Sequence, residues 1–146
     1  MSETGRPTFP HRDEHGRVLS LTELLVAALG GFVVGLVGLV LIDGVLALVR
    51  IGHFGHASGW LALILPALLY FDEIRAWRGY GVRFVVGLVG AVVAIGLGLV
   101  GAGLARSLPP VLSGAIGAVI AVTAYAPIWF LGIRWLTGQR LEMGSR

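Results

Sequence analysis

The chain has 146 residues, of which 56% are hydrophobic and only 13% charged, and its mean hydropathy is +0.88. A composition this apolar excludes an ordinary water-soluble domain. The absence of cysteine excludes disulfides, thiolate catalysis and cysteine-bound metals. The net charge of +3 comes from arginines that lie between apolar stretches rather than on one basic face, so the chain is not expected to bind nucleic acid.

Residues 1–19 are polar and rich in turn-forming residues, and we expect a mobile cytoplasmic N-terminal tail that buries no apolar surface. The following Ser20-Leu21-Thr22-Glu23 is a capping box, in which the Ser20 hydroxyl accepts a hydrogen bond from a backbone N–H and the Glu23 carboxylate reaches back. This predicts a helix that begins near Leu21. The apolar stretch is too long for the core of a signal peptide, which indicates a retained membrane span.

Four apolar stretches predict an all-α, polytopic membrane protein with a four-helix transmembrane bundle at residues 20–137. The expected spans are 21–42, 53–71, 82–105 and 111–133, with a cytoplasmic C-terminal tail at 138–146. Three of them reach the roughly 20 residues that a helix needs to cross about 30 Å of hydrocarbon. Span 53–71 is the least regular, because its strictly apolar part is short and Pro66 is expected to kink it; it either crosses fully or is re-entrant.

The positions of the arginines predict the orientation, because cytoplasmic loops retain positive charge. Nine of the eleven lie in the N-terminal tail, the middle loop or the C-terminal end, and the other two are Arg50 and Arg106. Both termini are therefore expected on the cytoplasmic side of a cell membrane, and the lack of lysine and asparagine suggests a prokaryotic one. The residues predicted to anchor the cytoplasmic boundary are Arg75, Trp77, Arg78, Trp129 and Trp135.

A heptapeptide, Phe-Val-Val-Gly-Leu-Val-Gly, occurs at 32–38 and again at 84–90. One explanation is the duplication of a two-helix hairpin, as in transporters built from parallel repeats, and the other is chance among Gly, Val and Leu.

Small residues recur at spacings of about four in the spans. Such faces let helix backbones approach closely where lipid supplies no hydrophobic force for association, so we expect packing within the chain or against other chains rather than a glycine-lined pore. The residues with this expected role are Gly31, Gly35, Gly38, Gly87, Ala91, Gly98, Gly114 and Ala118.

Candidate chemistry is confined to the predicted outer ends of the first two spans, where Asp43 lies within an apolar run and His53 and His56 follow. An ionisable residue in a membrane is a functional candidate, here for protons or cations, although an acid near the headgroups can simply pair with an arginine. Two histidines and one acid make a weak ligand set, so no metal or cofactor is predicted.

The sequence favours a structural or accessory subunit of a larger membrane assembly, which contacts the lipid bilayer and other subunits or further copies of itself. The alternative is a small homo-oligomeric transporter or channel for a proton, cation or small solute, with Asp43 near its outer mouth. No catalytic motif occurs, and the chain is not expected to be an enzyme; a lipid-modifying enzyme is the least supported class.

Overall fold

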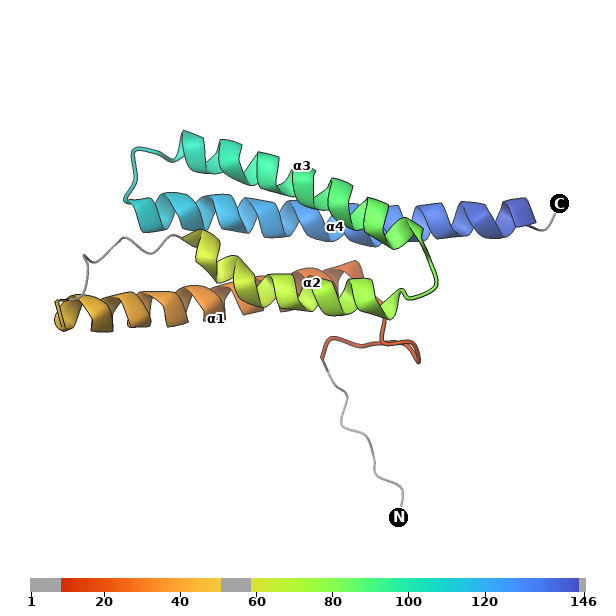
Figure 1. The fold of residues 1–146 in the computed structure, drawn as a ribbon, viewed down its shortest axis with the longest axis horizontal. Helices are drawn as coiled ribbons and strands as arrows, with labels where there is room; N and C mark the ends of the chain where they lie inside the picture. Colours follow the sequence, from red (N-terminus) through yellow and green to blue (C-terminus); the bar gives the residue numbers. More distant parts are fainter. Residues whose placement is uncertain (1–8, 51–58, 145–146) are drawn as a thin grey trace, which may run out of the picture.

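The computed structural model describes residues 9–50 and 59–144, and the structural statements below concern these residues. The chain folds into α1 (Leu21–Leu48), a 3-10 helix η1 (Gly59–Leu63), α2 (Ile64–Ala76), α3 (Val82–Leu104) and α4 (Pro110–Gly144). The helices run alternately in opposite directions, so the start of α1, the turn between α2 and α3 and the end of α4 lie at the same end (Figure 1). We call this the basic end, because most of the described arginines lie on the segments gathered there, among them Arg12, Arg17, Arg75, Arg78, Arg83 and Arg134.

Three helices are long and apolar enough to cross a membrane, namely α1, α3 and the part of α4 from residue 110 to 138. Three apolar helices of this length indicate a membrane protein. The predicted span 53–71 is not among them: residues 53–58 lie outside the described part, and the remainder forms η1 and the first half of α2.

The sequence predicted that Pro66 kinks the span 53–71, of which only residues 59–71 are described. Pro66 lies in the first turn of α2, directly after η1, and its side chain is buried. A proline is tolerated in the first turn because the backbone N–H groups there have no partner within the helix. The chain changes from 3-10 to α geometry between Leu63 and Ile64, two residues before the proline.

The other boundaries agree with the predictions at some ends and differ at others. α1 begins at Leu21, as predicted, and α3 matches its predicted span to within one residue. α1 continues past the predicted end at 42 to Leu48. α4 continues to Gly144, although a tail was predicted from residue 138.

The N-terminal segment, residues 9–19, differs most from its prediction. An antiparallel bridge joins Arg12 and Val18, and the side chain of Val18 is completely buried in the core. The predicted capping box is also wrong, because Ser20 makes no side-chain cap hydrogen bond. The Glu23 carboxylate instead accepts hydrogen bonds from the backbone N–H of His11, at 2.7 Å, and from its ring, at 2.8 Å.

Close packing of α3 on α4 forms the largest interface of the bundle. A Cβ atom added to Gly98 would lie 2.7 Å from the carbonyl oxygen of Gly117, and a Cβ atom on Gly117 would lie equally close to that of Gly98. Only glycine allows the two backbones to approach so closely. α1 packs mainly on η1, α2 and α4, whereas α2 and α3 barely touch (Figure 1).

The repeated heptapeptide lies on α1 and on α3, which run in the same direction (Figure 1). Its two copies are packed differently, because Phe32 is 3% exposed and Phe84 is 63% exposed. A Cβ atom on Gly35 would collide with the backbone of Ala62, whereas one on Gly87 would meet only side chains. The repeat in sequence is therefore not matched by equivalent packing.

Candidate functional site

The predicted outer site is only partly visible. Asp43 is half-buried on the last third of α1, at the end opposite the basic end, and His53 and His56 lie outside the described residues. Among the side chains that the structure describes, in the ranges 9–50 and 59–138, no three His, Cys, Asp or Glu residues come together as a metal site would require. The outer site thus remains a prediction from the sequence.

The predicted small-residue faces divide into covered and uncovered positions. A Cβ atom on Gly35 would lie 2.8 Å from the carbonyl oxygen of Ala62, so this glycine is needed for the contact of α1 with η1. Gly98 has the same role between α3 and α4. A Cβ atom on Gly38, by contrast, would meet no described heavy atom within 4 Å.

The remaining small residues make looser or indirect contacts. A Cβ atom on Gly31 would be 3.7 Å from Leu65, which is an ordinary van der Waals distance. Gly87 lies over the side chains of α2 and α4, and Ala91 is half-buried beside a cavity described below. Gly114 and Ala118 are buried in α4, where η1 packs against it.

Two of the predicted interface anchors lie in the protein core instead. Trp129 is 0% exposed and Trp77 is 6% exposed, so neither ring is available to headgroups. Trp135, Arg75 and Arg78 are exposed, as an anchor must be. The sequence predicted the level of these aromatic residues along the helix axis, but not the side of the helix on which each one lies.

A buried charged cluster that the sequence analysis missed lies at the basic end, centred on Glu73 of α2. The residue is 1% exposed. One carboxylate oxygen, Oε2, accepts the backbone N–H of Val18 at 3.0 Å and lies 3.7 Å from the Arg12 guanidinium. The other oxygen accepts the indole N–H of Trp77 at 3.1 Å.

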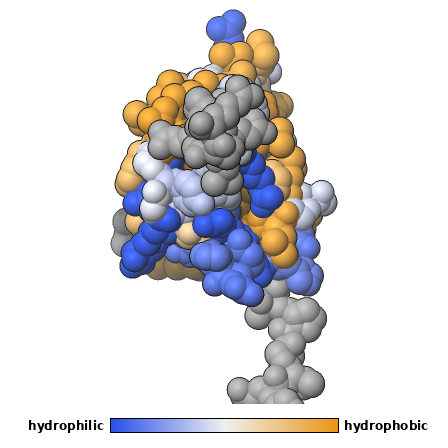
Figure 2. Space-filling model, turned by 90° about the vertical axis from the view of Figure 1, so that its right-hand side faces the viewer, coloured by the Kyte–Doolittle hydropathy of each residue, from blue (hydrophilic) through white to orange (hydrophobic). Residues whose placement is uncertain are grey.

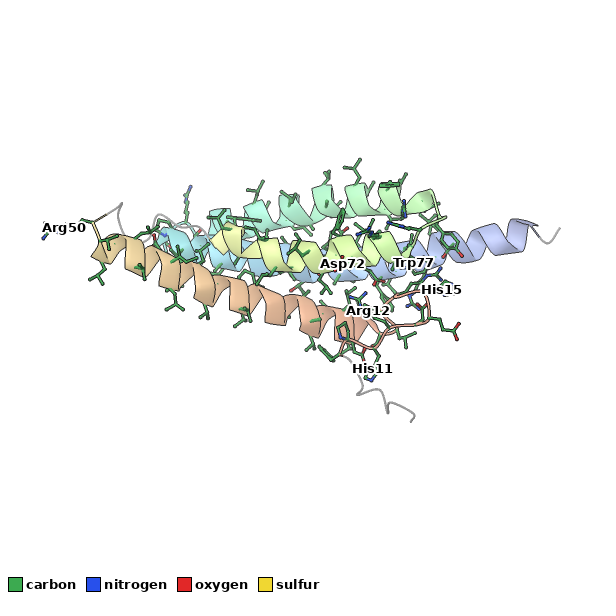
Figure 3. The ribbon with its side chains drawn as sticks, turned by 60° about the horizontal axis from the view of Figure 1, so that its bottom comes forward. His11, Arg12, His15, Arg50, Asp72 and Trp77 are labelled. Atoms are coloured by element: carbon green, nitrogen blue, oxygen red, sulfur yellow. The ribbon has the colours of Figure 1, made fainter. Side chains whose placement is uncertain are left out.

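Two further arginines complete this group. Arg134 of α4 donates a hydrogen bond to the carbonyl oxygen of Val18 at 2.8 Å, and the Arg17 guanidinium stacks 4.4 Å from the centre of the Trp77 ring. We call these residues the Glu73 cluster: Arg12, Arg17, Val18, Glu73, Trp77 and Arg134. Figure 3 shows Arg12 and Trp77 at this end and Arg50 at the far end, and Figure 2 shows hydrophilic residues gathered on this end.

The electrostatics of the cluster indicate a structural role. Glu73 lies outside the three candidate spans. Burial raises the pKa of its carboxyl group, while the N–H groups of Val18 and Trp77 and the charges of Arg12 and Arg134 oppose the rise. Both carboxylate oxygens already have donors, so the group is suited to tying the N-terminal segment to α2 and α4 rather than to accepting a proton from a substrate.

A signal for Glu73 was present in the sequence. Pro66, Tyr70, Glu73 and Trp77 recur at spacings of three and four, and all four are buried on one side of η1–α2. An acid on an otherwise apolar helical stripe predicts a buried, paired carboxylate.

The second feature is an apolar cavity of about 270 Å³ between α2, α3 and α4. It exists because α2 and α3 barely touch and because small side chains line it, among them Ala91 and Ala94 of α3. Tyr70 and Tyr125 form part of its wall; their ring centres are 4.5 Å apart, and the Tyr70 hydroxyl donates to the carbonyl oxygen of Val122 at 3.0 Å.

No family model, curated protein or solved structure matches this chain, so the assignment of a function depends on the geometry described above.

Proposed function

We propose that the protein is a structural or accessory subunit of a larger membrane assembly, and that it packs against its neighbours through glycines that its own fold leaves uncovered. The observation that carries this proposal concerns Gly30 and Gly38 of α1 and Gly96 and Gly103 of α3. A Cβ atom added to any of the four would meet no described heavy atom within 4 Å.

Uncovered glycines weaken a helix unless something packs against them. Glycine destabilises a helix by about 0.5–1 kcal/mol relative to alanine, and among the described residues these four positions gain no close contact in return. The two glycines of each pair are separated by two helical turns and lie on one broad side of their helix. A neighbouring transmembrane helix that packs there would restore the lost stability.

The exposure of α1 supports the same proposal. Of its 28 residues, only Leu24, Ala28 and Phe32 are buried. Exposed apolar side chains carry no cost in lipid, so hydrophobicity by itself does not bring helices together in a membrane; close backbone contact does. α1 offers such contact at Gly38, on a part of the helix that the chain itself leaves largely uncovered.

The proposed orientation places the basic end in the cytoplasm of a prokaryotic cell and both termini with it, with the predicted span 53–71 as a fourth crossing. The arginines of the basic end support this, since Arg50 and Arg106, which follow α1 and α3, lie at the other end. The chain has no cysteine, so single cysteines introduced at Arg78 and Leu108 can test the orientation. An impermeant maleimide applied to intact cells should label the second and not the first; the reverse pattern contradicts the orientation.

Co-purification tests the proposed function. The full chain, extracted in a mild detergent from the membrane in which it is expressed naturally, should elute with other chains at a fixed stoichiometry. Gly38→Leu should remove those chains without lowering the melting temperature, because its side chain enters space that the fold leaves open. Val37→Leu, an exposed neighbour, is the matched control. A lone monomer, or a complex that tolerates Gly38→Leu, contradicts the proposal.

A further inference from the structure

The cavity between α2, α3 and α4 has the size of a binding site for an apolar chain. Its volume of about 270 Å³ compares with about 150 Å³ for an apolar cavity that accommodates benzene. Along α2 it extends from Pro66 to Ile74, about 12 Å at 1.5 Å per residue. This is close to the roughly 15 Å thickness of the hydrocarbon in one membrane leaflet.

The cavity opens sideways onto the lipid-facing surface. Phe71 of α2 and Ile95 of α3 line it, and they are 61% and 50% exposed, so they lie at its rim. An apolar molecule dissolved in the bilayer therefore reaches the cavity without passing through water. Inside, the small side chains of Ala91 and Ala94 leave room for it.

Positive charge lies directly beyond the end of the cavity at the basic end. Arg75 follows Phe71 by four residues, hence on the same side of α2, and Arg78 follows in the exposed turn. Asp72 is an exposed acid beside them. The neighbouring acid, Glu73, is buried, and its carboxylate is bonded to Val18 and Trp77. Two exposed guanidinium groups beside one exposed carboxylate favour an anion at this level of the membrane.

We propose that this cavity binds one acyl chain of an anionic phospholipid, whose phosphate group lies against Arg75 and Arg78. The apolar walls select a chain of hydrocarbon, and the arginines select a negative headgroup. This inference does not depend on the proposed role as a subunit, because the cavity and the arginines belong to a single copy of the chain.

Native mass spectrometry of the full chain in detergent tests the apolar half of the site. The probe is phosphatidylglycerol added after delipidation, with phosphatidylcholine as the comparison. Ala91→Phe fills the cavity and should weaken the binding of phosphatidylglycerol about tenfold, the equivalent of about two methylene groups lost from burial. Val92→Phe adds the same ring at an adjacent, exposed position outside the cavity and should bind as the unmodified chain does. Ala67→Phe, at the exposed side of the same cavity, repeats the test should Ala91→Phe fail to fold.

A second test variant and its matched control examine the part of the site that binds the headgroup. Arg75→Gln should lower the preference for phosphatidylglycerol over phosphatidylcholine about fivefold, as expected for one arginine near the membrane surface. Arg50→Gln removes the same charge at the opposite end and should leave the preference unchanged. Equal binding of both lipids by the unmodified chain, or undiminished binding in both cavity-filling variants, overturns the proposal.

Discussion

The Glu73 cluster predicts that Glu73→Ala releases the N-terminal segment from the bundle. Removal of the carboxylate leaves the backbone N–H of Val18 and the indole N–H of Trp77 without their acceptor, and it leaves Arg12 without its partner. An unsatisfied buried donor costs about 1–3 kcal/mol. We expect a total loss of about 2–4 kcal/mol in the free energy of unfolding. This is near the lower end of the summed costs of the unsatisfied groups, because water can reach part of the released segment.

Limited trypsin digestion measures this release directly. The chain has no lysine, so trypsin cleaves only after arginine, and the bond between Arg17 and Val18 is protected while Val18 is buried. Glu73→Ala should accelerate cleavage at this bond and lower the melting temperature in detergent. Glu14→Ala, which changes an exposed acid in the same segment, should do neither. Unchanged cleavage in Glu73→Ala would show that the cluster does not hold the segment.

Three further predictions concern Gly35, the ionisation of Glu73 and Asp43. Gly35→Ala should destabilise the protein by about 1–3 kcal/mol, because its methyl group would lie 2.8 Å from the Ala62 carbonyl oxygen, whereas Gly38→Ala should not lower the melting temperature; equal melting temperatures would refute this packing. Burial raises the pKa of Glu73, so the part of its contribution that depends on protonation is complete below its ordinary value of 4.5 and is lost as the pH rises through the folded-state value, while the hydrogen bonds with Val18 and Trp77 remain. The melting temperature of the unmodified chain minus that of Glu73→Gln should accordingly fall from acidic to neutral pH. A rise in this difference contradicts the argument. Asp43→Asn should leave proton flux in reconstituted vesicles at its background level if the protein is an accessory subunit, and a flux that this substitution abolishes would favour the transporter instead.

The positions of the apolar helices could be predicted from the sequence because hydropathy is a local property, although α1 and α4 extend beyond their predicted ends. α3 lies where its apolar stretch lies, and α1 begins at Leu21. The predicted start of α1 was right although the reason given for it was wrong, since the capping box does not form and Glu23 binds His11 instead. Local patterns place a helix end more reliably than they identify the partner of each polar group.

Local sequence patterns could not predict which side of each helix is buried. They also could not predict contacts between residues that are far apart in the sequence. Trp129 and Trp135 lie six residues apart on α4, yet one is completely buried and the other is 62% exposed. Which of them faces lipid depends on where α3 packs, and the boundary rule for aromatic residues does not contain that information. Val18 was assigned to a tail because residues 1–19 are mostly polar; its backbone is held by Glu73 and Arg134, which are far away in the sequence.

The attachment of Val18 also orders the assembly of the chain. Its N–H group is bound by a residue of α2 and its carbonyl group by a residue of α4, so both of its tethers exist only after the last helix has been synthesised. The segment that precedes the described helices in the chain therefore cannot complete its contacts before α4 has been made. Its docking therefore requires that α2 and α4 have both reached their places.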